Sequence, residues 1–236
     1  MLSLKDSQVI LIVLIVERSC SLSVDSLNRR IPIRVNMTED LSKFLQEDDY
    51  VDFMEITLSR EIQNAIGHCE TDEERVRVAY EAVRDQIDNV FDIDAIGSPA
   101  KASRVIRDRM GCCHAKANLL AAMLRFYKIP VGFCYQRINM GKGLGYHLHC
   151  YNAVYLNGRW IKLDARGNRE GIDAQFSLDE PKLAFEIDEE LGEEDIKGIF
   201  AEPDLDCMNV IEKADDIEDV MFGMPDNITR KPDIKE

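Results

Sequence analysis

The sequence predicts an α+β fold, because helix signals and strand signals come in separate blocks along the chain. Helical patterns extend over residues 72–88 and 112–127. After these helices, from Val131, the side-chain pattern has the period of two residues that is typical of strands. The pair Asn157-Gly158 then separates two further β-rich runs. Helices followed by a group of strands joined by tight turns are typical of this fold class.

The composition is that of an intracellular globular protein. The chain has 236 residues, of which 45% are hydrophobic and 31% are charged, so a sizeable core is expected and disorder is not. The cysteines are odd in number and have no repeated spacing, which argues against a disulfide framework and for reduced thiols in the cytoplasm. The seven are Cys20, Cys69, Cys112, Cys113, Cys134, Cys150 and Cys207.

The net charge of -15 is concentrated in the last quarter of the chain. Residues 172–236 hold 21 Asp or Glu against 6 Lys or Arg, whereas residues 1–171 hold 23 of each. No basic stripe is available for nucleic acid, and an anionic membrane would repel the acidic part. A solvated acidic surface is the favoured interpretation of the last quarter, and a docking face for a basic partner is the alternative.

An apolar run near the start of the chain, Val9–Val16, is expected to form a buried strand. As a helix it would reach only about 12 Å, whereas the hydrocarbon core of a membrane is roughly 30 Å thick. Glu17-Arg18 follows the run directly, without the small-residue cleavage site of a signal peptide. The β-branched residues that dominate the run favour a strand.

Two amphipathic helices are expected before the adjacent cysteines. Thr71-Asp72-Glu73-Glu74 is a capping box that begins the helix over residues 72–88. Ser98-Pro99 reads as a cap with proline at the first helical position, and Gly111 ends this shorter helix. The apolar faces consist of Val76, Ala79, Tyr80, Val83 and Ile87 in the first helix and of Ala102, Val105 and Ile106 in the second.

The next helix, residues 112–127, is expected to be buried on much of its surface, because its apolar stripe is wide. Ile129-Pro130 ends it. Strand patterns follow: the first is Val131–Ile138, and a glycine-rich loop separates it from a hairpin at Asn157-Gly158. Asn-Gly between β-rich runs favours a type I′ turn. The helical stripe consists of Leu119, Leu120, Met123, Leu124 and Tyr127.

The hairpin turn fixes which side chains share a face. If Leu156 and Arg159 flank a two-residue loop, Tyr151 lies opposite Asp164, and His149 lies opposite Arg166. His149 and Asp164 are then diagonal neighbours, roughly 7 to 8 Å apart between backbones, within reach of a hydrogen bond. His147 shares their face but lies one pleat farther from the carboxylate and is the weaker candidate.

Cys112 and Cys113 lie where a nucleophile would be activated. A helix start offers unpaired backbone N–H groups and the positive end of the helix dipole, which favour a thiolate and could bind an oxyanion. Helical spacing does not separate the two residues, and small buried thiols are the alternative interpretation for both. Three other cysteines, Cys69, Cys134 and Cys207, have no such setting and are expected to be structural.

Several segments together resemble the transglutaminase-like superfamily. In that family a Gly-x-Cys opens the nucleophile helix, an Ala follows four residues after the Cys, and Leu-Leu, Leu-Arg and a Gly-Ile-Pro-Ala-Arg segment come later. A histidine strand with its hairpin and a closing Trp and Asp complete the motif. The similar runs are residues 111–125 (GCCHAKANLLAAMLR), 128–131 (KIPV, with Lys and Val in place of Gly and Ala), 149–160 (HCYNAVYLNGRW) and 160–164 (WIKLD).

The resemblance implies a papain-like fold with the nucleophile helix packed on an antiparallel sheet. It favours Cys113 over Cys112 and His149 over His147, and Asp164 completes a catalytic triad. We expect three parts in the chain: an extension over residues 1–50 with a strand, a catalytic core over 51–172, and an acidic extension over 173–236 packed on the core. No cofactor or metal is implied.

The expected activity is acyl transfer or hydrolysis at an amide, either a peptide bond or a glutamine side chain, through a thioester. Hydrolysis is favoured, because no Asp-rich loop of calcium-binding spacing is present. One alternative is a catalytically inactive binding module of the same fold. The other is a zinc site, although Cys-x-x-Cys and helical His-x-x-x-His spacings are missing. The ligands of such a zinc site would be Cys112 or Cys113, His147, His149 and Cys150.

Overall fold

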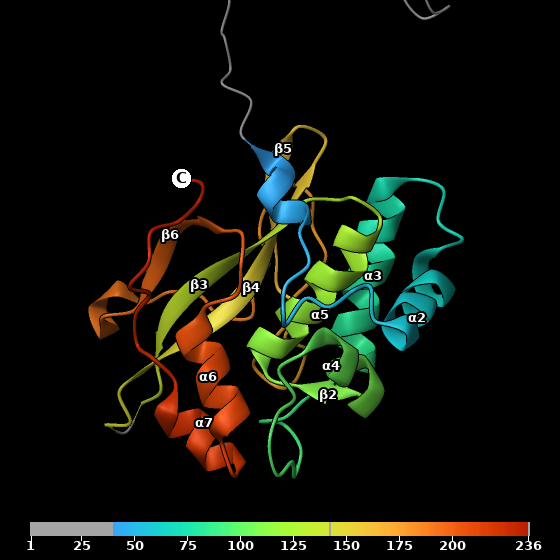
Figure 1. Ribbon diagram of the computed structural model, residues 1–236. Coiled ribbons are helices and arrows are strands. Elements are labelled where there is room, and N and C mark those ends of the chain that lie inside the picture. Colours follow the sequence, from blue (N-terminus) through green and yellow to red (C-terminus); the bar gives the residue numbers. More distant parts are fainter. Residues whose placement is uncertain (1–39, 142, 236) are drawn as a thin grey trace, which may run out of the picture. The chain divides into compact units, whose positions relative to one another are not determined.

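The computed structural model describes residues 40–141 and 143–235 (Figure 1). The chain divides into two units, Met1–Thr38 and Glu39–Glu236, and every described residue belongs to the second. The strand predicted over Val9–Val16 lies outside the described residues.

Helical segments predominate up to residue 126 of this unit, the longer strands follow, and two further helices come after the last strand. The helical segments are η2 (Leu41–Leu45), α2 (Ile56–Ile66), α3 (Asp72–Gln86), α4 (Ala102–Asp108), α5 (Cys113–Phe126), η3 (Glu189–Leu191), α6 (Leu205–Lys213) and α7 (Ile217–Gly223). The strands are β1 (Asp88–Asn89), β2 (Met110–Gly111), β3 (Val131–Asn139), β4 (Tyr146–Leu156), β5 (Arg159–Leu163) and β6 (Glu194–Phe200).

The main sheet has four strands in the order β5-β4-β3-β6, and each neighbouring pair is antiparallel. Helix α5 lies against this sheet, chiefly on β4. Helices α3 and α4 pack against α5 on the side of α5 that faces away from the sheet (Figure 1). Twelve of the fourteen residues of α5 are buried, as its wide apolar stripe predicts. The predicted α+β fold, with this helix packed on an antiparallel sheet, is therefore confirmed.

Helix α3 begins as its capping box predicts. The Thr71 hydroxyl accepts a hydrogen bond from the Glu74 backbone N–H at 3.1 Å, and the Glu74 carboxylate accepts one from the Glu70 N–H at 2.9 Å. These contacts satisfy N–H groups that a helix start leaves unpaired. The helix ends at Gln86, two residues before the predicted end.

The prediction that Ser98 caps the next helix was wrong. Helix α4 begins at Ala102, and its N-cap Lys101 makes no side-chain cap hydrogen bond. The Ser98 hydroxyl instead accepts a hydrogen bond from the Cys112 backbone N–H at 2.9 Å. A long-range contact with the start of α5 therefore replaces the local cap that the sequence pattern suggested.

Two residues after the end of α5, this chain has Lys128 at a position where the transglutaminase-like superfamily usually has glycine. Lys128 has φ +63°, in the left-handed region that glycine adopts without steric cost. The following Ile129 N–H then donates to the Leu124 carbonyl at 3.1 Å, which closes the last turn. This backbone geometry gives a physical reason for a glycine preference at the position.

The Asn157-Gly158 hairpin has the predicted turn and register. Asn157 and Gly158 both have positive φ, +54° and +80°, and the pairs run from Leu156–Arg159 to Asn152–Leu163. The ladder ends there, so the predicted pairing of Tyr151 with Asp164 and of His149 with Arg166 does not form. The chain turns away because the Asp164 side chain accepts the Arg166 backbone N–H at 3.0 Å.

Helices capable of spanning a membrane are missing from the described ranges, where each helix is too short or too polar to do so.

Candidate active site

The start of α5 places its two cysteines in different surroundings. Cys112 is the N-cap residue and is fully buried, whereas Cys113 is the first helical residue and is partly exposed. The Cys112 side chain makes no cap hydrogen bond, and the Cys112 backbone N–H donates to the Ser98 hydroxyl at 2.9 Å. Cys112 is therefore enclosed in the core, and Cys113 is the thiol that solvent can reach.

The edge of β4 faces this helix start. Strand β5 pairs with β4 only as far as Asn152, so the edge beyond that residue is open to other partners. The Cys150 backbone N–H makes a hydrogen bond with Cys113, and the ring Nε2 of His114 donates to the Leu148 carbonyl at 2.9 Å. The early end of β5 thus makes room for the start of α5 beside the histidine strand.

His149 and Asp164 form a buried pair. The distance between His149 Nε2 and Asp164 Oδ2 is 2.7 Å, and the two side chains are 2% and 1% exposed. Asp164 also accepts backbone N–H groups from Arg166 at 3.0 Å and Ala184 at 2.9 Å. With its oxygens held by three donors, the carboxylate fixes the orientation of the imidazole.

His149 makes a second side-chain hydrogen bond, with Cys113. Because Asp164 occupies Nε2, the nitrogen left for the thiol is Nδ1. The structure thus brings together Cys113, His149 and Asp164, the three residues that the sequence singled out.

The charges of this trio shift the two pKa values in opposite directions. Burial alone would raise the pKa of Cys113, but the His149 charge and hydrogen bond lower it below its usual value. Burial alone would lower the pKa of His149, but Asp164 and Cys113 outweigh it and raise the pKa. A thiolate beside an imidazolium is therefore the favoured state near neutral pH.

The neighbouring cysteine and histidine behave differently. Burial, followed by the charge on Cys113, raises the pKa of Cys112 to about 12, so Cys112 remains a thiol. Burial lowers the pKa of His114 to about 4, so His114 is neutral at neutral pH. The choice between the two adjacent cysteines, which helical spacing leaves open, thus has a clear electrostatic basis in the structure.

His147 lies two residues before His149 on β4 and is half-buried. It lines the same cleft as Cys113, and burial lowers its pKa. Within the described residues, no hydrogen bond joins it to Asp164. The hairpin register predicts this difference, because His147 lies farther along the strand from the carboxylate than His149 does.

The acidic part of the chain contributes contacts to the site that sequence reasoning missed. The ring of Phe185 lies edge-on to His149, with 4.9 Å between ring centroids, and its carbonyl accepts a hydrogen bond from the Gln136 amide at 3.4 Å. Gln136 is the cross-strand partner of His149 on β3. A local sequence pattern could not reveal Phe185, because a long irregular segment brings it back to the sheet.

Cys113 and His149 open into a cleft of about 420 Å³. Its walls come from the segment after β1, the start of α5, the β3 and β4 ends, the loops after β5, and α7. The lining residues are Asn89, Phe91, Cys112, Cys113, His114, Ile138, Asn139, Met140, His147, Leu148, His149, Arg166, Arg169, Phe185, Glu186, Glu193, Val220, Met221 and Met224.

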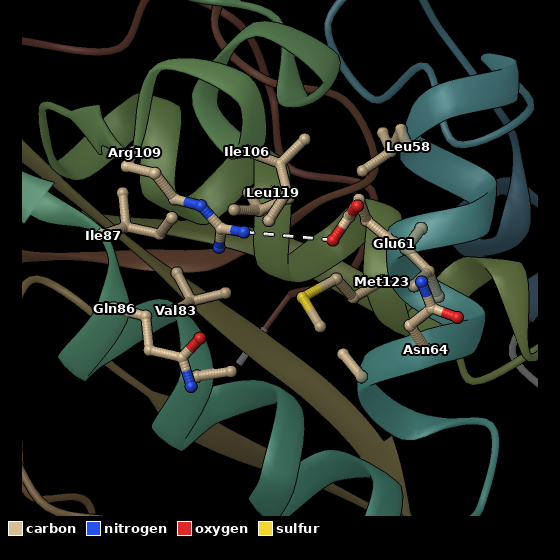
Figure 2. A pocket seen from close by; sticks show the side chains of 13 residues that line it. Leu58, Glu61, Asn64, Val83, Gln86, Ile87, Ile106, Arg109, Leu119 and Met123 are labelled. Atoms are coloured by element: carbon tan, nitrogen blue, oxygen red, sulfur yellow. Dashed lines mark ion pairs between the residues drawn. The ribbon is translucent and has the colours of Figure 1, made fainter.

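A second pocket, of about 230 Å³, lies among α2, α3, α4 and α5. Figure 2 shows its apolar side chains, with Arg109 and Glu61 extending toward each other from different elements. Their ion pair has an N–O distance of 3.9 Å. Its lining includes neither a cysteine nor a histidine, in contrast to the cleft at the start of α5.

The zinc alternative has no support in the described residues. Across residues 40–141 and 143–235, no group of three or more His, Cys, Asp or Glu side chains is arranged to hold a metal ion. The reason is that Cys112 turns into the core and the His149 ring is engaged by Asp164 and Cys113.

Comparison with known proteins agrees with the sequence resemblance. The family model for the transglutaminase-like superfamily matches residues 60–165, a range that includes Cys113, His149 and Asp164. A search of curated proteins finds no match.

Two solved structures are similar to part of this chain. A candidate cysteine protease from Cytophaga hutchinsonii is 21% identical, with a TM-score of 0.46, over 58% of this chain and 45% of that one. A candidate protease from Parabacteroides distasonis is 17% identical, with a TM-score of 0.37, over 53% of this chain and 25% of that one. The present chain thus spans less than half the length of either. By the family match, residues 60–165 form a domain of the transglutaminase-like superfamily.

Proposed function

We propose that this protein is a cysteine-dependent amide hydrolase that uses Cys113, His149 and Asp164. The observation that carries the proposal is the position of His149, which bonds Asp164 through Nε2 and Cys113 through its other nitrogen. A thiolate paired with an oriented imidazolium is the arrangement that nucleophilic attack on an amide requires.

The proposed reaction has two halves. The Cys113 thiolate attacks the amide carbonyl carbon, and His149 gives its proton to the departing nitrogen as the carbon–nitrogen bond breaks. The Cys113 backbone N–H, in the first turn of α5, would stabilise the negative oxygen. A thioester between Cys113 and the acyl group remains.

Water completes the cycle. His149, now neutral, takes a proton from a water molecule as the water oxygen attacks the thioester carbonyl. The carbon–sulfur bond breaks, the acid product leaves, and the thiolate–imidazolium pair is restored. Throughout, Asp164 holds the imidazole orientation and stabilises its charge. If an amine replaced water in this half, the same residues would perform transamidation.

The test compares two matched variants one residue apart. Cys113→Ser is expected to lower hydrolysis of peptide amides by about a thousandfold or more, because an alcohol lacks the preformed anion. Cys112→Ser keeps a side chain suited to the N-cap position and is expected to retain most activity. Loss of activity in Cys112→Ser with full activity in Cys113→Ser would contradict the proposal. Equal inactivity of the wild type and Cys113→Ser toward every peptide would favour the binding-module alternative.

A further inference from the structure

One wall of the Cys113 cleft comes from α7 and the residues just after it, in the acidic last part of the chain, and the side chains of this wall are apolar. Val220 and Met221 lie on α7, and Met224 follows the end of that helix. Phe91 and Met140 line other parts of the cleft. Three methionines in one cleft give flexible, polarisable contact surface, which suits bulky apolar groups of varied shape.

The charged side chains in the cleft are mostly used within the protein. Arg166 donates two hydrogen bonds to the Asp92 carboxylate at 2.6 and 2.9 Å, and Arg169 pairs with the same carboxylate at 2.9 Å. The Glu193 oxygens accept the backbone N–H groups of Asn139, the last residue of β3, and of Asp188, each at 2.9 Å. Each of these charges thus has a partner within the protein, with Arg166 and Arg169 sharing one carboxylate.

Glu186 is the exception among the described lining residues. It is exposed, and no ion pair or hydrogen bond of its carboxylate is found in the part of the chain that the structure describes. Because it is solvated, its charge is screened by water. A preference for basic substrates, mediated by Glu186, is the competing possibility. The peptide assay described below distinguishes it from an apolar preference.

The apolar wall is fixed relative to the nucleophile. The Pro225 carbonyl accepts the Leu148 backbone N–H at 3.1 Å, next to His149 on β4. At the other end, Asp216 caps α7 by accepting the Asp219 N–H at 2.9 Å, and Val220 is fully buried. The wall is therefore already formed before any substrate arrives, which lowers the cost of binding.

Exposed apolar side chains also lie on three segments that are near cleft-lining residues in the sequence. Phe222, which follows Met221, is 61% exposed, Leu144 in the β3–β4 connection is 44% exposed, and Ile93 in the segment after β1 is 42% exposed. In Figure 1, α7 and the loop that precedes α4 reach the same end of the described unit.

We propose that the cleft binds an extended peptide segment with a bulky apolar side chain, such as Leu, Met or Phe, beside the amide to be cut. Met221 and Met224 would contact that side chain and determine the specificity. This inference rests on the proposed function, since it names the substrate class of the same site.

The first test uses internally quenched peptides that differ at one residue, placed in turn at each position around a central amide. Leu, Met and Phe are expected to give kcat/KM values at least roughly tenfold higher than Ser, Glu or Lys. Mass spectrometry of the products locates the cut relative to the varied residue. A preference for Lys or Arg would overturn the proposal and point to Glu186, and equal rates for all residues would also overturn it.

Variants then test the apolar wall. Met221→Glu is expected to reduce the ratio between apolar and polar peptides at least roughly tenfold, and Met221→Gln, of similar length and uncharged, gives a milder loss in the same direction. Met54→Glu is the matched control, since Met54 is 63% exposed and does not line the cleft. An unchanged ratio in both Met221 variants would contradict the assignment of the wall.

Failure of this inference can be distinguished from failure of the proposed function. Each protein is also assayed by iodoacetamide labelling of Cys113 and by hydrolysis of p-nitrophenyl acetate. Rapid labelling and ester hydrolysis without an apolar preference would overturn the substrate class alone. Slow labelling together with inactivity toward every peptide and the ester would overturn the proposed function as well.

Discussion

Two cavities in this protein lie along the same helix, and they differ in what converges on them. At the start of α5, the cleft combines a thiol, an imidazole and a buried carboxylate. Farther along the helix, the pocket of Figure 2 has Leu119 and Met123 in its lining and a loose ion pair between Arg109 and Glu61. Enclosed apolar space alone is therefore a poor guide to chemistry.

The difference arises from which part of the helix is exposed to each cavity. The first turn of α5 offers backbone N–H groups and lies beside an open strand edge, so polar groups can meet there. The middle of the helix has no unpaired backbone groups, and its neighbours are apolar side chains of other helices. We expect substitutions in the cleft to change reactivity and substitutions in the pocket to change stability.

The largest expected effect follows from removing His149. His149→Ala eliminates the group that stabilises the thiolate and protonates the leaving nitrogen, so kcat/KM should fall by about a thousandfold or more. His147→Ala, the matched change two residues earlier on β4, should cost less than about tenfold, because His147 has no contact with Asp164. Similar losses in the two variants would remove the distinction between these histidines.

A smaller effect is expected from Phe185→Ala. Loss of the ring admits water to the His149–Asp164 pair and weakens their attraction, so the raised pKa of His149 should move down toward its usual value. The alkaline limb of the pH–activity profile should shift to lower pH, and kcat should fall by about tenfold. Phe176→Ala is the control, since Phe176 packs against Tyr80 instead. An unshifted alkaline limb in Phe185→Ala would contradict this role.

In the second pocket, a filling substitution should affect stability only. Ala65 lines that pocket on α2, and Ala65→Met places flexible apolar atoms into the space. The free energy of unfolding should rise by about 0.5 to 2 kcal/mol, measured by urea denaturation. Hydrolysis rates should not change. A loss of activity would show that the two cavities are coupled and would weaken the comparison.

The smallest expected effect concerns the ion pair at the second pocket. Arg109 and Glu61 side chains are 50% and 42% exposed, and their charges are 3.9 Å apart. Glu61→Gln should therefore change the free energy of unfolding by less than about 1 kcal/mol. A larger loss, or a marked dependence of stability on salt, would indicate that the pair contributes more than its exposure suggests.

The sequence predicts best those features that depend on neighbouring residues. The Asn157-Gly158 turn fixes the hairpin register, because both residues tolerate positive φ and a two-residue loop leaves one pairing. Thr71 and Glu74 likewise predict the start of α3. Ser98 is the instructive error: its pattern is that of a cap, but its hydroxyl bonds to Cys112, which lies far along the chain.

For the site, the sequence identifies the candidate residues but not their supports. Hairpin parity places His149 near Asp164, and the contact forms even though the chain leaves the ladder first. Ala184 and Phe185 could not be predicted, because they approach the histidine through tertiary packing of an irregular segment. The choice of Cys113 over Cys112 depended on resemblance alone, whereas burial and charge now supply a physical reason.

The most direct test of the account is alkylation with less iodoacetamide than protein across a pH series, with mass spectrometry locating the label. The lowered pKa of Cys113 predicts that it is labelled preferentially well below pH 8, and that His149→Ala removes this preference. Cys112, whose pKa is raised to about 12, should remain unlabelled throughout. Labelling of several cysteines at similar rates, rising together near pH 8.5 as for ordinary thiols, would contradict the central claim.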